Sequence, residues 1–137
     1  MTTIQQLRKL AEHRERVARM DLAVAERDRI AQQAAVDASD RALAECAALE
    51  GHGVADELNR QTWLLRTELV RRGGERKLLE RQRDVGRREE VMRTAAREKG
   101  ALDRIVELRA EEVTHAAGRR EQQGLDESGI QAWLRAR

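Results

Sequence analysis

The sequence of 137 residues contains no proline, phenylalanine or tyrosine, and its only aromatic residues are two tryptophans. Cores built on β-sheets normally use aromatic and large β-branched side chains, so this composition argues against a sandwich, a barrel or an α/β domain. The single cysteine, Cys46, excludes a disulfide within one chain. No apolar run approaches the roughly 20 residues that span a bilayer, and the N-terminus lacks an apolar signal segment. We therefore expect a cytoplasmic, soluble protein.

The sequence also lacks a large excess of charge of either sign. The 27 basic and 25 acidic residues leave a formal net charge of only +2, whereas nucleic-acid-binding proteins usually carry a denser positive field. The 21 alanines, together with abundant arginine, glutamate and leucine, are typical of long helices or a coiled coil rather than of a disordered chain.

Two long helices joined by one turn are expected in a single domain, residues 1–137. Thr3-Ile4-Gln5-Gln6 has the pattern of a capping box and predicts the start of helix one, about 3–50. Gly51-His52-Gly53 predicts a turn at about 51–55. Asp56 is the expected N-cap of helix two, about 56–125 or beyond, and Gly73-Gly74 is a candidate kink within it.

Apolar residues recur at helical spacing on one face of each predicted helix, flanked by i,i+4 charge pairs such as Glu68–Arg72. This pattern is typical of a coiled coil, and a short turn makes its helices antiparallel neighbours. We predict an all-α fold, a long antiparallel two-helix coiled-coil hairpin with a C-terminal helical overhang. The face of helix one contains Leu10, Val17, Met20, Val24, Ala31, Ala35, Ala38, Ala42 and Leu49, and the face of helix two contains Leu78, Val85, Met92, Leu102, Val106, Val113 and Ala116.

The overhang follows from the unequal helix lengths. Pairing back from the turn places the start of helix one opposite Leu102–Val106 and leaves about 30 residues at the C-terminus without a partner helix. This segment contains Val113, Leu125, Ile130, Trp133 and Leu134 and is interpreted as a docking segment, with a frayed tail as the alternative.

A group of alanines and a group of large apolar residues lie near the turn, and each group has two interpretations. The alanines at 31, 35, 38 and 42 either let the two helices approach closely or line a shallow groove that receives a partner. Trp63 and the leucines at 64, 65 and 69 either pack at the tip of the hairpin or form a contact surface.

No arrangement of residues indicates catalysis, so we expect no enzyme activity, no catalytic residue, no metal and no cofactor. His13, His52 and His115 lie on separate stretches, and Cys46 has no second cysteine at metal-ligand spacing. Residues 71–97 are rich in arginine, but the acidic residues among them favour a solvated helix face over a nucleic-acid site.

Three stretches of the chain resemble the FliJ family of flagellar export proteins, the soluble stalk of the type III export ATPase. Leu7-Arg8-Lys9-Leu10 with Arg14-Glu15 is similar to the family's start, and Asn59-Arg60-Gln61 with Trp63-Leu64-Leu65 is similar to the segment after the turn. The most distinctive stretch runs from Arg119-Arg120-Glu121-Gln122-Gln123-Gly124-Leu125-Asp126-Glu127 to Leu134-Arg135 and resembles the family's C-terminal signature.

The resemblance implies a stalk without catalysis of its own, monomeric when alone, in the pore of the hexameric flagellar export ATPase, whose assembly and hydrolysis it promotes. It implies further contacts with the cytoplasmic domain of the membrane export gate and with export chaperones, in the cytoplasm at the inner face of the membrane at the flagellar base, without membrane insertion or nucleic-acid binding. The expected gate contact near the tip contains Leu65, Leu69, Ala38 and Ala42, with Ala31, Ala35, Arg72 and Arg76 aligned beside them. The expected ATPase contact in the overhang contains Glu121, Gln122, Leu125, Asp126, Trp133, Leu134 and Arg135.

Three other functions fit the sequence. One is the stalk of a virulence-type injectisome, which composition does not separate from the flagellar protein. Another is a structural coiled coil that self-associates as a stoichiometric homodimer or higher oligomer. The third is a protein that binds nucleic acid or an acidic surface through residues 71–97, with an affinity that falls steeply with salt.

Overall fold

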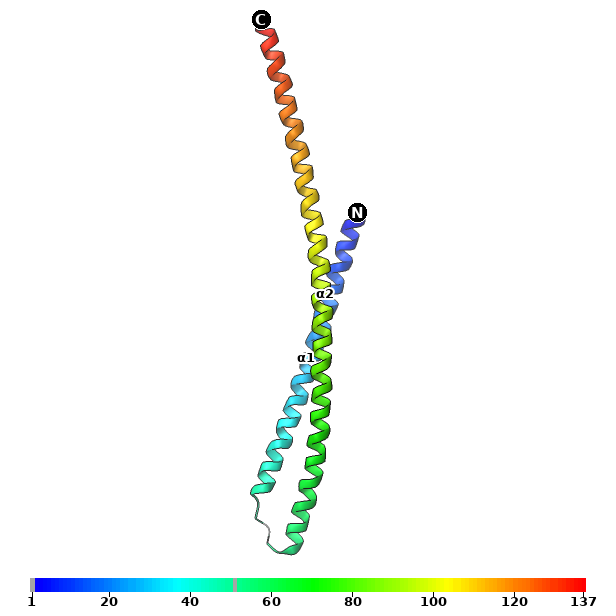
Figure 1. Cartoon of the computed structure of the whole chain (residues 1–137), viewed down its shortest axis with the longest axis vertical. Coiled ribbons are helices and arrows are strands. Elements are labelled where there is room, and N and C mark those ends of the chain that lie inside the picture. Colours follow the sequence, from blue (N-terminus) through cyan, green and yellow to red (C-terminus); the bar gives the residue numbers. More distant parts are fainter. Residues whose placement is uncertain (1, 51) are drawn as a thin grey trace. The chain divides into compact units, whose positions relative to one another are not determined.

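The computed structural model describes residues 2–50 and 52–137, and these residues form two α-helices and no strand. Helix α1 spans Thr3–Ala48 and helix α2 spans Val54–Arg135, with a short connection between them (Figure 1). The all-helical prediction is confirmed, and the arrangement is consistent with a helical hairpin. The chain divides into two compact parts. One contains Arg14–Ala95, and the other contains the start of α1 up to His13 together with Ala96–Arg137.

The N-terminus of α1 is capped one residue earlier than the sequence pattern predicts. The backbone N–H of Thr2 donates to Gln5 Oε1 at 3.0 Å, and the N–H of Gln5 donates to Thr2 Oγ1 at 3.3 Å. Reciprocal bonds of this kind form a capping box, because each side chain satisfies an N–H that has no partner within the helix. The capping residues are therefore Thr2 and Gln5 rather than Thr3 and Gln6.

The connection between the helices also differs from the prediction. Helix α1 ends at Ala48, and α2 begins at Val54, before the predicted N-cap Asp56. Gly53 has a φ of 103°, which glycine adopts without strain, and its carbonyl accepts the N–H of Glu57 at 3.2 Å. Gly53 thus takes the N-cap position, and Asp56 lies in the first turn, where its charge favours the helix N-terminus. Gly51, the first glycine of the predicted turn, lies outside the described residues.

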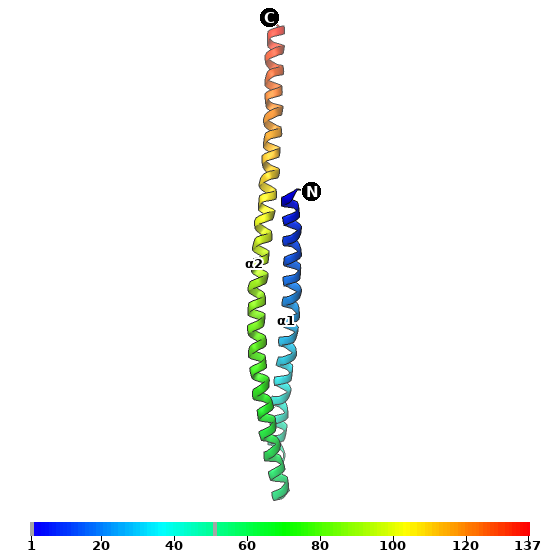
Figure 2. The same ribbon diagram turned by 90° about the vertical axis from the view of Figure 1, so that its right-hand side faces the viewer.

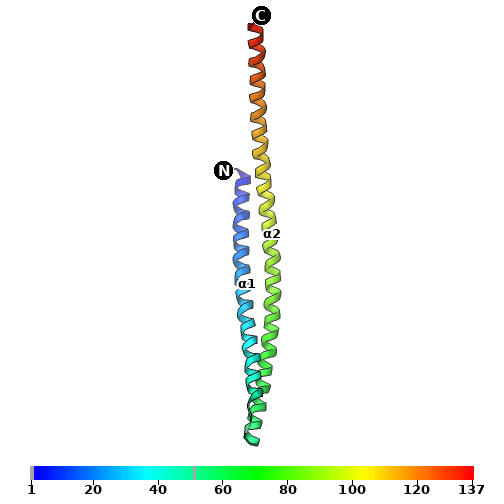
Figure 3. The same cartoon turned by 90° about the vertical axis from the view of Figure 1, so that its left-hand side faces the viewer.

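In the part that contains Arg14–Ala95, α1 lies beside α2 in both side views (Figures 2 and 3). Asp21 Oδ2 lies 3.5 Å from Arg88 Nη1, and Asp28 Oδ2 lies 3.8 Å from Arg81 Nη1. The two aspartates are seven residues apart on α1 and the two arginines are seven residues apart on α2, so the contact repeats every two helical turns. Residue numbers fall along α2 as they rise along α1.

Helix α1 turns a different face toward α2 than the sequence pattern predicts. Five large members of its predicted face are exposed by 41% to 65%, namely Leu10, Val17, Met20, Val24 and Leu49. The alanines at 31, 35 and 38 are exposed as well, so they do not bring the helices together. The buried residues of α1 are Ala11, Glu15, Ala18, Ala25, Val36 and Cys46.

The physical reason lies in the sizes of the side chains that meet. Two rows with a seven-residue period lie one residue apart on α1, and the prediction favoured the row with larger side chains, Val17 and Val24. In the structure, α2 supplies the larger side chains of the seam, and the alanines of the other row, Ala18 and Ala25, let the helices approach closely. A rotation of α1 by one residue, about 100°, would also remove its aspartates from the arginines of α2.

The predicted face of α2 is correct as far as Val106. Val85 is buried, and Leu78, Met92, Leu102 and Val106 are half-buried. Val113 continues the same seven-residue row but lies in the overhang expected to have no partner helix, and it is 70% exposed.

Gly74 marks a close approach of the two helices rather than an interruption of α2. Helix α2 continues through Gly73 and Gly74, and the carbonyl of Gly74 accepts the side-chain N–H of Gln32 at 3.0 Å. A Cβ atom at residue 74 would lie 3.4 Å from Val36 Cγ2, whereas a Cβ at residue 73 would meet open space.

An ion pair also links the two helices in the other part of the chain. Arg8 Nε donates to Asp103 Oδ1 at 2.8 Å, and Asp103 lies in the stretch expected opposite the start of helix one. After Val106, every side chain of α2 except Ala116 is exposed. The end of α2 is therefore a helical segment whose apolar side chains face solvent.

A matched pair of variants tests which face of α1 packs on α2. We expect Ala18→Glu to lower the free energy of unfolding by about 2 kcal/mol or more, because it places a charge in the seam. Val17→Glu, one residue away on the exposed face, should change it by less than about 0.5 kcal/mol. Urea unfolding of dilute protein, followed by circular dichroism, measures both. A larger loss of stability for Val17→Glu than for Ala18→Glu would show that the face predicted from the sequence packs on α2.

Candidate functional site

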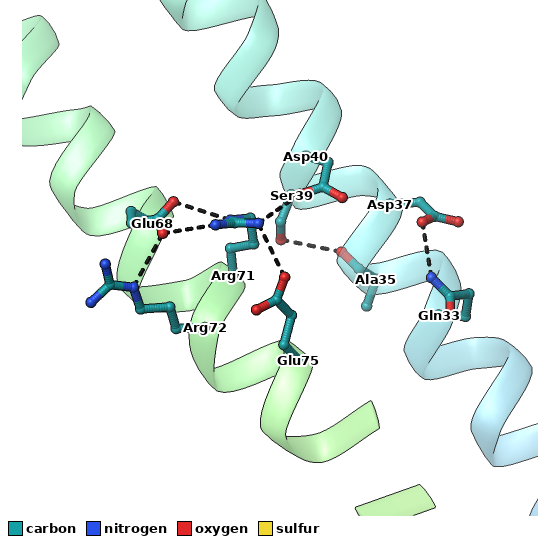
Figure 4. A network of polar contacts seen from close by, with 9 residues as sticks. All are labelled: Gln33, Ala35, Asp37, Ser39, Asp40, Glu68, Arg71, Arg72 and Glu75. Carbon is teal, nitrogen blue, oxygen red and sulfur yellow. Dashed lines mark hydrogen bonds and ion pairs between the residues drawn. The ribbon is translucent and has the colours of Figure 1, made fainter. Parts of the chain in front are cut away.

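A network of ion pairs joins α1 and α2 in the half of the hairpin next to the turn (Figure 4). Arg71 is its centre. Its Nε and Nη2 donate to the two carboxylate oxygens of Glu68 at 3.0 and 2.9 Å, and its Nη1 donates to Glu75 at 3.0 Å. The same Nη1 lies 3.6 Å from Asp40 Oδ1 on α1. Glu68 also accepts a hydrogen bond from Arg72 at 3.1 Å.

The network changes the titration of its members. Hydrogen bonding from Arg71 lowers the pKa of Glu68 below its usual value, with a second contribution from Arg72, although partial desolvation opposes the shift. Hydrogen bonding and the negative charge of Glu68 raise the pKa of Arg71. Both groups are therefore charged at neutral pH, and the network links the helices by charge as well as by packing.

Other arginines in the arginine-rich stretch, residues 71–97, also form ion pairs with carboxylates. Arg87, Arg88 and Arg93 each lie within 4 Å of an acidic side chain three or four residues away on α2. Paired charges of this kind reduce the positive field that phosphate groups would meet. The pairing supports the interpretation of this stretch as a solvated helix face.

A groove lies beside the turn, between the end of α1 and the start of α2. Its volume is about 520 Å³, and Trp63, which is 43% exposed, forms part of its wall. Arg60 donates from Nε to the carbonyl of Cys46 at 3.3 Å and pairs with Glu57 at 3.0 Å. The remaining lining residues are Ala42, Glu45, Leu49, Glu50, Asp56 and Asn59.

Arg60 has a role that the sequence analysis did not assign to it. The last turn of α1 contains no basic residue, and the backbone N–H of Leu49 donates to the Cys46 carbonyl at 3.2 Å, which leaves room for further donors at this helix end. Arg60 supplies them from α2, to Cys46 and, at 3.5 Å, to Ala47. The lack of a basic residue in the last turn of helix one could have indicated that another residue caps this end. The sequence does not reveal which residue of α2 does so.

The residues of the expected gate contact lie in different surroundings. Leu65 and Leu69 are each 68% exposed, and because they are four residues apart they share one face of α2. Ala42 is half-buried and lines the groove, whereas Ala38 is exposed on the face of α1 directed away from α2. The structure thus brings Leu65 and Leu69 together on one face, whereas the two alanines lie on different surfaces of α1.

The residues of the expected ATPase contact lie on the exposed end of α2. Leu125, Trp133 and Leu134 are exposed by 69%, 56% and 58%, and the Arg137 guanidinium lies 4.1 Å from the centre of the Trp133 ring. Gln122 Nε2 donates to Asp126 Oδ1 at 3.1 Å, one helical turn away. The other expected members, Glu121 and Arg135, are exposed on the same helical segment.

Three glycines weaken the helix in this exposed segment. A Cβ atom at Gly118, Gly124 or Gly129 would meet no neighbouring atom, so packing does not require any of them. Each costs about 1 kcal/mol of helix stability relative to alanine. Isolated helices are marginal in water even without glycine, so a partner surface would add much of the stability of this segment.

No protein-family model, curated protein or solved structure matches the chain. Neither described helix is long and apolar enough to cross a membrane. Within residues 2–50 and 52–137, no group of three or more histidine, cysteine or acidic side chains is arranged to hold a metal ion.

The Glu68 network predicts a stability loss in acid. Because the folded-state pKa of Glu68 lies below its ordinary value of 4.5, its stabilisation is complete above that pH and disappears as the pH falls through the lowered pKa. Glu68→Gln should therefore flatten the decrease of Tm below pH 4.5. Circular dichroism melts across this range measure the effect, with exposed Glu26→Gln as the control. Equal slopes for both variants would contradict it.

Proposed function

We propose that this chain is the stalk of a flagellar type III export ATPase and belongs to the FliJ-like class of export proteins. In this role it is a non-enzymatic, antiparallel two-helix coiled coil that sits in the pore of the hexameric ATPase. It promotes assembly and hydrolysis there and contacts the cytoplasmic domain of the membrane export gate, with export chaperones as further partners.

The heptad geometry supports the coiled-coil part of the proposal. Buried Ala11, Ala18 and Ala25 recur every seven residues on α1, and Leu78, Val85 and Met92 recur every seven residues on α2. Cross-helix ion pairs flank these rows at the positions that flank the seam of a coiled coil. Descending residue numbers on α2 agree with an antiparallel pairing.

The exposed end of α2 is the observation that carries the stalk proposal. Ile130, Trp133 and Leu134 recur three and four residues apart, so they form one apolar stripe on a helix, and all three are more than half exposed. Tryptophan and neighbouring aliphatic side chains are common at the centres of protein interfaces. A stripe of this kind on a glycine-weakened helix needs a protein surface to cover it, as the pore of an ATPase ring would.

Leu65 and Leu69 support a second contact, with the export gate. Both side chains are exposed, and they share one face of α2 close to the turn. This surface lies in the part of the chain that contains Arg14–Ala95, whereas the terminal stripe lies in the other part. Separate surfaces allow the two contacts to be disrupted independently.

The decisive experiment is to measure the hydrolysis rate of the cognate export ATPase during titration with this protein. Stimulation that saturates near one chain per hexamer is expected. If the rate does not change, although circular dichroism shows the chain to be helical, the stalk proposal is wrong.

The terminal stripe generates a prediction for the ATPase. Trp133→Ala combined with Leu134→Ala should weaken ATPase stimulation by about tenfold or more, because buried aromatic anchors dominate interface energies. Helicity should remain nearly unchanged, since both side chains are exposed. Leu79→Ala combined with Val91→Ala, also exposed but outside the stripe, serves as the control. Unchanged stimulation by the terminal double variant would refute the assignment of this segment.

The leucine pair generates a prediction for the gate. Leu65→Ala combined with Leu69→Ala should weaken binding to the purified cytoplasmic gate domain by about tenfold while leaving ATPase stimulation intact. Isothermal titration calorimetry and the hydrolysis assay measure the two effects on the same preparation. Loss of ATPase stimulation with normal gate binding would show that the two surfaces have exchanged roles.

A further inference from the structure

Helix α1 carries a second apolar row on the face directed away from α2. We call it the outer row, and its bulky members are Val17, Met20 and Val24, with exposed fractions of 41%, 62% and 54%. Exposed alanines continue it at 31, 34 and 38. The spacings of three, four and seven residues are those of a coiled-coil seam. Helix α1 therefore has two seams, of which α2 covers only one.

The side chains of the outer row differ in size along its length, and the two halves are complementary when a second copy runs in the opposite direction. Its first half, residues 17–24, carries the bulky side chains, and its second half, residues 31–38, carries the alanines. Two copies that pair in opposite directions place Val17 on Ala34 and Met20 on Ala31 of the second copy, while Val24 faces the aliphatic stem of Arg27. Pairing in the same direction would set bulky against bulky and alanine against alanine, which packs poorly.

The edge of the outer row repeats the same complementarity. Arg16, Ala23, Ile30 and Asp37 follow one another every seven residues along this edge, and all four are exposed. In the reversed pairing, Ala23 meets Ile30 of the second copy, and Arg16 meets Asp37 of the second copy. By two-fold symmetry each contact forms twice, so two ion pairs bracket the apolar centre.

Charge repulsion along the other edge of the outer row is weak. The reversed pairing brings Asp21 near Asp28 of the second copy, but Arg88 and Arg81 of the same chain already pair with these aspartates. Arg27, in the middle of the row, extends its aliphatic stem over the apolar surface and keeps its charge in water.

We propose that the outer row of α1 is a self-association surface, on which a second copy of this chain docks in the antiparallel direction through its own outer row. The contact is small and rich in alanine, so the dimer is weak and reversible, with a Kd on the order of 100 μM. Dilute protein is monomeric. The pairing does not depend on the proposed stalk function, because it uses neither the terminal stripe nor the leucine pair.

Sedimentation equilibrium of the full chain over a range of concentrations tests the proposal. The average mass should rise from monomer toward dimer as the concentration approaches about 500 μM. Met20→Glu should raise the Kd by about tenfold or more, because it places a charge against the alanines of the second copy. Val91→Glu, on an exposed face of α2, should leave the Kd unchanged. A constant monomer mass at all concentrations, or equal effects of both variants, would overturn the proposal.

Disulfide trapping tests the direction of the pairing. In a Cys46→Ser background, one preparation carries Met20→Cys and another carries Ala31→Cys. The mixture should form a disulfide between unlike chains under mild oxidation, whereas neither preparation alone should cross-link efficiently. Efficient cross-linking of the Met20→Cys preparation alone would show parallel pairing and refute the antiparallel contact. Circular dichroism confirms that each variant remains helical.

A charge exchange tests the edge contact. Arg16→Asp alone and Asp37→Arg alone should each weaken the dimer several-fold, and the double variant should restore the original Kd, because the two ion pairs re-form with reversed sign. Failure of the double variant to restore the dimer would overturn the proposed register.

One further outcome distinguishes a different occupant of the outer row. If the wild-type chain stays monomeric and Met20→Glu abolishes stimulation of the export ATPase, the row binds the ATPase and self-association is refuted. If Met20→Glu abolishes the dimer and leaves stimulation intact, both the self-association surface and the stalk assignment stand.

Discussion

The close packing of small side chains from α1 against larger ones from α2 is the contact on which the rest of this structure depends. No large side chain is fully buried anywhere in the described residues, so the seam is thin. Its strength comes from repetition every seven residues and from ion pairs beside it, which hold one helix face against the other. Gly74 illustrates the constraint, because it brings the backbone of α2 next to Val36 and Gln32.

A thin seam leaves the larger apolar side chains of the chain outside it. Some of them form three surfaces, namely the outer row of α1, the leucine pair Leu65 and Leu69, and the terminal stripe with Trp133, and others lie singly along both helices. A protein that buried its large side chains internally would have little left for other molecules. This chain does the opposite, which suits the proposed role of a component that works by contacting partners.

Arginine has two structural roles near the turn that composition alone does not separate. Arg71 pairs with Glu68 and Glu75 within α2 and with Asp40 across on α1, and Arg60 donates to the carbonyl groups of Cys46 and Ala47 at the end of α1. Planar guanidinium groups with several donors suit both tasks. At these two positions, therefore, arginine serves helix pairing and capping.

The sequence by itself determined the helical class, the presence of a break near Gly53, the seam of α2 and the exposure of Trp133. Each of these follows from local chemistry, namely the lack of proline and aromatics, the glycines, and a heptad row with no rival on its helix. Only the tertiary structure decided which of two adjacent heptad rows of α1 meets α2, and it chose the row of Ala18 over that of Val17. It also revealed the groove and the capping by Arg60. These features depend on side-chain sizes and charges from a distant part of the chain, because a small row becomes the better seam only when the opposing helix supplies the bulk.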